Sequence, residues 1–77
     1  MTLYNVMLEG TDQDNFFLVT IEVIGVDENQ VSTLALADAM KAGLNIIGIE
    51  EIEAQYQVDD SLQSGVTQIY GKTYFVK

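Results

Sequence analysis

The stretch that decides the fold is residues 16–52, FFLVTIEVIGVDENQVSTLALADAMKAGLNIIGIEEI, which is the most apolar part of the chain. Its first segment, residues 16–24, is apolar on both faces of an extended strand except near the end, which predicts a central or doubly covered strand. Its last segment, residues 46–52, is rich in β-branched side chains and predicts a second strand, which continues to Val58. We therefore expect strand, helix and strand.

The helix between these strands is expected to run from Asp27 to Ala42. Asp27 and Gln30 have the spacing of a capping box, in which the Asp27 side chain accepts a hydrogen bond from the backbone three residues further on. Gly43 suits the position that follows a helix, because it tolerates a left-handed backbone conformation. Lys41 lies in the last turn, where a cation complements the helix dipole.

The apolar side chains of this helix fall on two sides rather than in one stripe. One side, around Asp38, carries Val31, Leu34, Ala35, Ala39 and Ala42. The other side carries Leu36, Ala37, Met40 and Leu44. A helix that is apolar on two sides is usually buried on both, and in so short a chain a partner or a second copy would supply the second cover. The alanines also favour the helix without any such contact. Leu36, Met40 and Leu44 are the candidate oligomer face, and a homodimer is one expectation.

The flanking segments add a strand at each end, over residues 3–8 and 68–76. The polar residues 9–15 predict a hairpin loop, and residues 59–65 predict a turn or a mobile loop. The element order is then β-β-α-β-β. The economical arrangement is an α+β fold, with a single helix packed on one face of a mainly antiparallel four-stranded sheet, in one domain over residues 1–77.

The chain lacks several residue types that most active sites use. The chain has no cysteine and no histidine, and its three basic residues are Lys41, Lys72 and Lys77. It therefore lacks thiolates, the commonest general base and the commonest zinc ligand. It also lacks a glycine-rich phosphate loop and any arginine. We expect no catalytic residues, no cofactor and no enzymatic activity.

Two acid pairs in the predicted loops are the candidates for binding a hard cation. They are Asp12 with Asp14, and Asp59 with Asp60. A dedicated calcium loop needs more oxygen ligands at set spacings and a glycine in mid-loop, and neither loop supplies them. We expect solvated loop acids and no metal site, and a small-ligand or metal-binding module is the least favoured function.

Three glutamates lie close together on the predicted strand over residues 46–58. Glu50, Glu51 and Glu53 are too close along one strand for the paired-carboxylate chemistry of glycosidases. They indicate an exposed acidic edge, which also discourages aggregation from strand to strand.

The net charge of −9 indicates what kind of partner the chain would bind. Such a charge repels nucleic acids and attracts basic surfaces, so we expect no direct nucleic-acid binding and no aromatic stacking platform for bases. A charge of this size also serves solubility, and both interpretations stay open. If the acids are the working surface, the predicted partner-binding residues are Glu50, Glu51, Glu53, Asp59, Asp60, Asp12 and Asp14.

The N-terminal sequence has neither a basic segment nor an apolar segment of the signal-peptide type, and no apolar run approaches the roughly 20 residues of a membrane helix. We expect a cytoplasmic protein without membrane contact.

The pattern of strand, Asp-capped helix and then residues 43–52, GLNIIGIEEI, resembles small acidic α+β proteins encoded by phages and other mobile elements. Anti-CRISPR proteins and other host-takeover inhibitors belong to that group. The resemblance is architectural and compositional, covers most of the chain and transfers no functional residue. It implies an inhibitor in the host cytoplasm that blocks a basic, often nucleic-acid-binding, surface of a host complex. The alternative is a small structural or oligomeric phage protein, such as a virion component.

Overall fold

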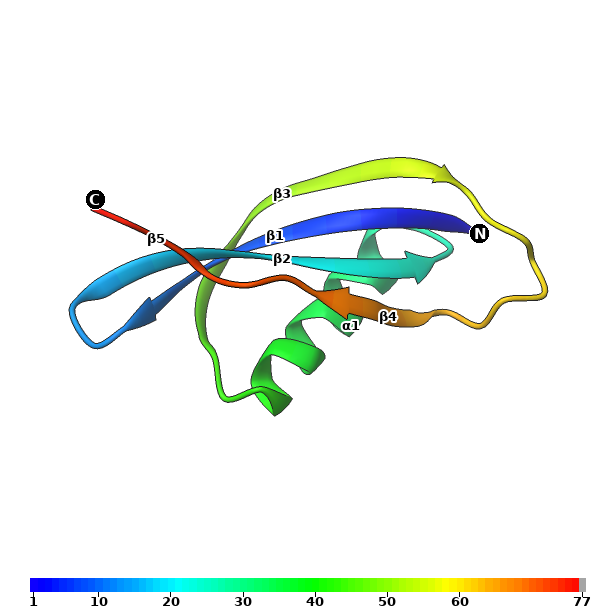
Figure 1. The fold of residues 1–77 in the computed structure, drawn as a ribbon. Helices are drawn as coiled ribbons and strands as arrows, with labels where there is room; N and C mark the ends of the chain where they lie inside the picture. The colour runs from blue at the N-terminus through cyan, green and yellow to red at the C-terminus, as the bar shows by residue number, and fades with distance from the viewer. Residues whose placement is uncertain (77) are drawn as a thin grey trace.

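The computed structural model describes residues 1–76, which form one antiparallel sheet with one helix on one face (Figure 1). The elements are β1 (Thr2–Asp12), β2 (Asn15–Gly25), α1 (Glu28–Lys41), β3 (Asn45–Gln57), β4 (Gly65–Ile69) and β5 (Thr73–Phe75). The strand order is β3-β1-β2-β4, and β5 pairs with another part of β2. The predicted α+β fold, with its order β-β-α-β-β and its helix on one face, is confirmed. We call the face that carries α1 the inner face and the opposite one the outer face.

The first hairpin is longer than the sequence predicts. β1 pairs with β2 without a break from Thr2 to Asp12, and only Gln13 and Asp14 form the turn. Gln13 takes up the left-handed backbone conformation, with φ of +58°. The polar residues 9–12, which were expected in a loop, are strand because β2 pairs with all of them and β3 pairs with most of them.

The strand expected over residues 68–76 is divided into β4 and β5, so the sheet has five strands where four were expected. Both pieces pair with the same edge of β2, β4 near its C-terminal end and β5 near its start. At the break, the Tyr70 backbone N–H donates to the Thr20 carbonyl at 2.9 Å, and the Tyr70 hydroxyl donates to Glu22 at 3.3 Å. The negative charge of Glu22 raises the pKa of Tyr70.

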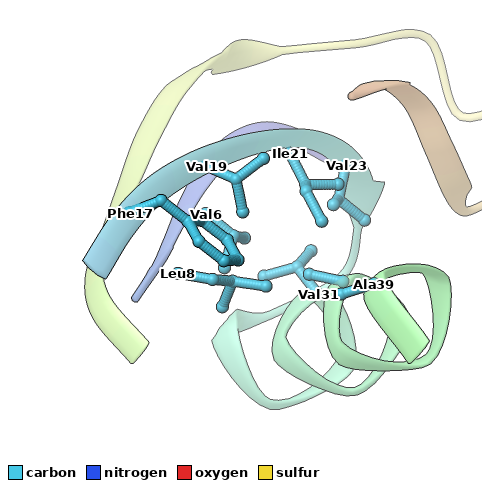
Figure 2. Close-up of a cluster of buried hydrophobic side chains, with 9 residues drawn as sticks. Val6, Leu8, Phe17, Val19, Ile21, Val23, Val31 and Ala39 are labelled. Carbon is cyan, nitrogen blue, oxygen red and sulfur yellow. The ribbon is translucent and has the colours of Figure 1, made fainter. Parts of the chain in front are cut away.

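The core lies between α1 and the inner face of β1 and β2 (Figure 2). Its fully buried members are Val6, Leu8, Phe17, Val19, Ile21, Val23, Val31, Ala35 and Ala39. The helix contributes a line of residues four apart, and two of the three are alanines, so its backbone approaches the sheet closely. This line belongs to the first of the two predicted apolar sides. On the second side, Met40 is 75% exposed.

Both ends of α1 are capped as predicted, which fixes where the chain enters and leaves the helix. The Asp27 carboxylate accepts a hydrogen bond from the Gln30 backbone at 2.8 Å, and the Gln30 side chain accepts one from the Val26 backbone at 2.7 Å. After the helix, Gly43 has φ of +77° and Leu44 donates to the Ala39 carbonyl at 3.0 Å. This arrangement is the Schellman motif, and it turns the chain directly into β3.

Candidate functional site

The strand β3 lies at one edge of the sheet and is exposed along most of its length. Within residues 1–76, it pairs with β1 along one edge and with no strand along the other. Only Ile46 and Ile52 are partly buried, whereas every other residue of β3 is exposed. An edge strand carries a row of unpaired backbone N–H and C=O groups. A long exposed edge of this kind is the feature from which the candidate site is built.

The pairing of β3 with β1 has three irregularities, and two of them keep three of its four isoleucines on the inner face. The register shifts at three places, and at each place β3 contains one residue more than β1, as in a β-bulge. Ile46, Ile49 and Ile52 therefore all lie opposite residues of β1 that face α1. Strict alternation would have put Ile49 on the outer face. Glu50 is one of the extra residues, so it has no direct partner on β1.

Because of these irregularities, the prediction of which side chains of this strand share a face is partly wrong. Strict alternation along the sequence predicts that Ile52, Ala54, Tyr56 and Val58 share one face, with Glu51, Glu53, Gln55 and Gln57 on the opposite one. Ile52 and Ala54 do lie opposite inner-face residues of β1. Tyr56, however, lies opposite Leu3 on the outer face and is 62% exposed, because the extra residue Gln55 reverses the alternation.

The acids of β3, which we call the edge glutamates (Glu50, Glu51 and Glu53), are all exposed. Glu51 and Glu53 line a hollow of about 110 Å³ on the outer face, together with three residues of β1 and β2: Asn5, Met7 and Thr20. The Gln55 amide donates to the Glu53 carboxylate at 2.9 Å. Neither of the ion pairs within residues 1–76 includes an edge glutamate. This part of the predicted partner-binding set therefore forms one exposed anionic strip.

The other predicted acids lie at the two ends of the molecule, which is 42 Å long (Figure 1). Asp12 and Asp14 are at the tip of the β1–β2 hairpin, and Asp59 and Asp60 are in the loop between β3 and β4 at the opposite end. The seven predicted residues therefore do not form one site.

The hairpin-tip acid Asp12 is used within the fold. Its carboxylate accepts a hydrogen bond from the Tyr74 hydroxyl at 2.9 Å and pairs with the Lys72 ammonium at 3.4 Å. These contacts lower the pKa of Asp12, the Tyr74 hydrogen bond most strongly. The Lys72 ammonium also lies 5.0 Å from the centre of the Phe17 ring and 5.5 Å from that of Tyr74. We call this group the tip clamp (Asp12, Phe17, Lys72 and Tyr74), and it fastens β5 to the hairpin.

The loop acids also have internal partners. The Asp59 carboxylate accepts a hydrogen bond from the Ser61 backbone at 2.9 Å, which lowers the pKa of Asp59. The Asp60 carboxylate pairs with the amino group of Met1 at 2.7 Å, which lowers the pKa of Asp60. Of the predicted acids, the edge glutamates are thus the set that lies together on one strand.

The three residues of the predicted oligomer face lie close together, on the inner side of β3. Leu36, Met40 and Leu44 line a groove of about 540 Å³ with residues of the helix end and the start of β3: Gly43, Asn45 and Ile46. We call it the α1–β3 groove. Ile49 lies further along β3 on the same face and is 42% exposed. An apolar surface therefore lies on one side of β3, and two of the edge glutamates, Glu51 and Glu53, lie on the other.

Sequence reasoning missed the exposure of Ile47 and Ile49, because a β-branched run after a helix is typical of a buried strand. The adjacent pair Glu50-Glu51 was the available signal. Two neighbouring charges cannot alternate between a buried and a solvated face, so such a pair indicates either an exposed strand or a bulge, and β3 has both features.

Among the described residues, no group of three or more acids is arranged to hold a metal ion. No helix in residues 1–76 has the length and apolar character needed to cross a membrane. Comparison of the chain with protein-family models, with curated proteins and with solved structures gave no match.

Proposed function

We propose that this chain is a non-enzymatic interaction protein that binds a basic protein surface through the edge glutamates of β3. The observation that carries the proposal is their position: three carboxylates on one exposed edge strand, outside both ion pairs of the described residues. In this proposal the protein is an inhibitor of the phage or mobile-element type. It acts in the host cytoplasm on a nucleic-acid-binding surface of a host complex.

The charge distribution supports this kind of partner. The net charge of −9 attracts a cationic surface from a distance of about one Debye length, roughly 8 Å at physiological ionic strength. An arginine- or lysine-rich surface that normally holds phosphates presents cations to carboxylates equally well. Acids at the rim of such an interface mainly raise the association rate and make binding sensitive to salt.

The first test measures binding of a fluorescent ten-residue oligolysine by anisotropy at about 50 mM and about 300 mM salt, a range over which screening rises. The double variant Glu51→Gln/Glu53→Gln is compared with Asp14→Asn/Glu28→Gln, which removes the same charge elsewhere. We expect the β3 variant to weaken binding at low salt by about tenfold, which corresponds to about 1.4 kcal/mol. We expect the control to change binding by less than about threefold, since each exposed charge contributes little.

Equal weakening in the two double variants would show that only the total charge matters, and the edge glutamates would lose their assigned role. If wild-type binding does not depend on salt, the electrostatic basis of the proposal is wrong. Capture from a host lysate with wild type and with Glu51→Lys/Glu53→Lys then identifies a partner as the protein that only the wild type retains.

A second function, a structural or oligomeric phage protein, is favoured by the α1–β3 groove. Met40 is 75% exposed at this groove, and an exposed apolar surface often marks a contact with another chain. Sedimentation equilibrium tests this function. A concentration-dependent dimer that Met40→Glu abolishes would support it, whereas a monomer at millimolar concentration would exclude it.

A further inference from the structure

The free edge of β3 has three properties that together define the form of a partner. The first is the backbone. Between two of its irregularities, residues 51–54 pair with β1 in an unbroken antiparallel register. The opposite edge of these residues faces no other strand of residues 1–76. Regular strand geometry directs backbone N–H and C=O groups to this edge, which a further strand can use; the Glu53 carbonyl accepts a long hydrogen bond of 3.5 Å from the Gln55 side-chain amide.

The second property is the apolar inner side. The α1–β3 groove lies at the start of β3, between Met40 of the helix and Ile46 of the strand. Ile49 extends the same apolar face along β3. A strand paired with residues 51–54 would have its inner-face side chains beside Ile52, with Ile49 next along the same face, and apolar side chains would gain by covering these two isoleucines.

The third property is the charged outer side. Glu51 and Glu53 lie opposite outer-face residues of β1 and line the outer hollow. The outer-face side chains of an added strand would stand next to these two carboxylates. Cross-strand pairs of opposite charge stabilise a sheet, whereas like charges destabilise it.

We infer that the partner of β3 is an extended segment in which apolar and basic residues alternate, and that it binds as an additional strand of the sheet. Successive side chains of a strand point to opposite faces, so alternation puts the apolar ones beside Ile52 and Ile49 and the Lys or Arg ones against the glutamates. This inference rests on the proposed function and goes further, because it states the conformation of the partner and how its side chains are arranged.

A second copy of this chain fits the same edge poorly. If β3 of one molecule paired with β3 of another, the edge glutamates of both would be brought together on one short ladder. The irregularities also limit the regular edge to residues 51–54, so the bound segment is short. A short segment is consistent with recognition of a flexible basic tail or loop.

The experiment uses an eight-residue fluorescent peptide in which lysine and valine alternate, and a control peptide with four lysines followed by four valines. The two have the same charge and composition, but only the first can present one kind of side chain to each face. Two further versions of the alternating peptide carry N-methyl groups on every second backbone amide, one version for each edge of the strand. N-methylation removes the hydrogen-bond donor and leaves the charge.

We expect the alternating peptide to bind at least tenfold more tightly than the block peptide. We expect N-methylation along one edge to remove this advantage and N-methylation along the other edge to leave most of it. In the protein, Ile49→Ser should weaken binding of the alternating peptide and leave that of the block peptide unchanged. The control Leu62→Ser, an exposed apolar residue in the loop after β3, should change neither.

Equal binding of the two peptides, with no effect of N-methylation, would overturn strand addition and leave the proposed electrostatic function standing. If neither lysine peptide binds more tightly than a glutamine analogue of the same length, the proposed function itself fails. If sedimentation finds a dimer that Ile49→Ser disrupts, the edge belongs to a second copy and the inference is wrong.

Discussion

The strands β2 and β3 each contain four isoleucine or valine residues but differ in how much of them is buried. β2 (11 residues) and β3 (13 residues) are the two strands that flank the helix, and both are rich in isoleucine or valine. β2 lies in the middle of the sheet, with β1 on one side and β4 and β5 on the other, and its inner-face residues are fully buried. β3 has a neighbour on one side and is mostly exposed. Composition makes both segments strands, but position in the sheet decides how much of each is buried.

Because of this difference in burial, β2 contributes mainly to the stability of the fold, and β3 is available for the proposed binding. Full burial of a valine, isoleucine or phenylalanine side chain stabilises a fold by about 1.5–3 kcal/mol, and β2 buries four such side chains against α1 and β1. The apolar side chains of β3 gain only part of this, because Ile47 and Ile49 stay about half exposed. The exposed positions of β3 can therefore vary at little cost to the fold, whereas Ile46 and Ile52 pack against the core.

The largest expected effect contrasts one isoleucine from each strand. Ile21 is 0% exposed in the core, and Ile21→Ala should lower the free energy of unfolding by about 3 kcal/mol, because it removes buried methylenes and leaves a cavity. Ile49→Ala should lower it by less than about 1 kcal/mol. Urea unfolding followed by far-UV circular dichroism measures both. If the two losses were equal, β3 would be as much a part of the core as β2.

Two glycines extend the contrast to the backbone. A Cβ at Gly10 of β1 would lie 2.6 Å from the carbonyl oxygen of Asn45 and in direct collision with the Phe17 ring. A Cβ at Gly48 of β3 meets nothing within 4 Å. Gly10→Ala should therefore destabilise the fold by about 2 kcal/mol, since the ring and the start of β3 must move. Gly48→Ala should change stability by less than about 0.5 kcal/mol. The same urea titration measures the free energy of unfolding of both variants. A large loss of stability in Gly48→Ala would contradict the open space that surrounds this residue of β3.

Much of the fold follows from local signals, and the site does not. The Asp27 cap, the Gly43 stop and the apolar alternation of Phe17 to Val23 all have local causes, so the helix and the central strand were predictable. The burial of β3 depends on which strand becomes its neighbour, which is a non-local property. The bulges that place Ile49 on the inner face arise from pairing with β1. The alternation of side chains along a strand does not predict where such bulges occur. The acids were visible in the sequence, but only the topology separates the edge glutamates from Asp12 and Asp60.

A smaller effect is expected at the helix that joins the two strands. Asp27→Ala removes the carboxylate that accepts the Gln30 backbone hydrogen bond and should lower the free energy of unfolding by about 1 kcal/mol. Asp27→Asn keeps an acceptor and should lose less than half of that amount. Thermal unfolding of the three proteins measures the difference. Equal losses in both variants would mean that the charge near the helix dipole matters and the cap geometry does not.

The smallest expected effect concerns the second edge of β2, which the tip clamp helps to cover. The lowered pKa of Asp12 means that its carboxylate stabilises the folded state above its ordinary pKa of 3.8, and that this stabilisation is lost as the pH falls through the folded-state value.

The melting temperature of wild type should therefore exceed that of Asp12→Asn at pH 7, and the gap should narrow below pH 3.8. Asp14→Asn, at the same hairpin tip but outside the ion pairs formed within residues 1–76, should show a smaller gap at pH 7. A gap for Asp12→Asn that is constant down to pH 2 would show that the Tyr74 and Lys72 contacts do not depend on the charge of Asp12. β5 would then be held on β2 by contacts that do not depend on charge, which include its strand pairing and the packing of Phe16 against Phe75 and of Phe17 against Tyr74.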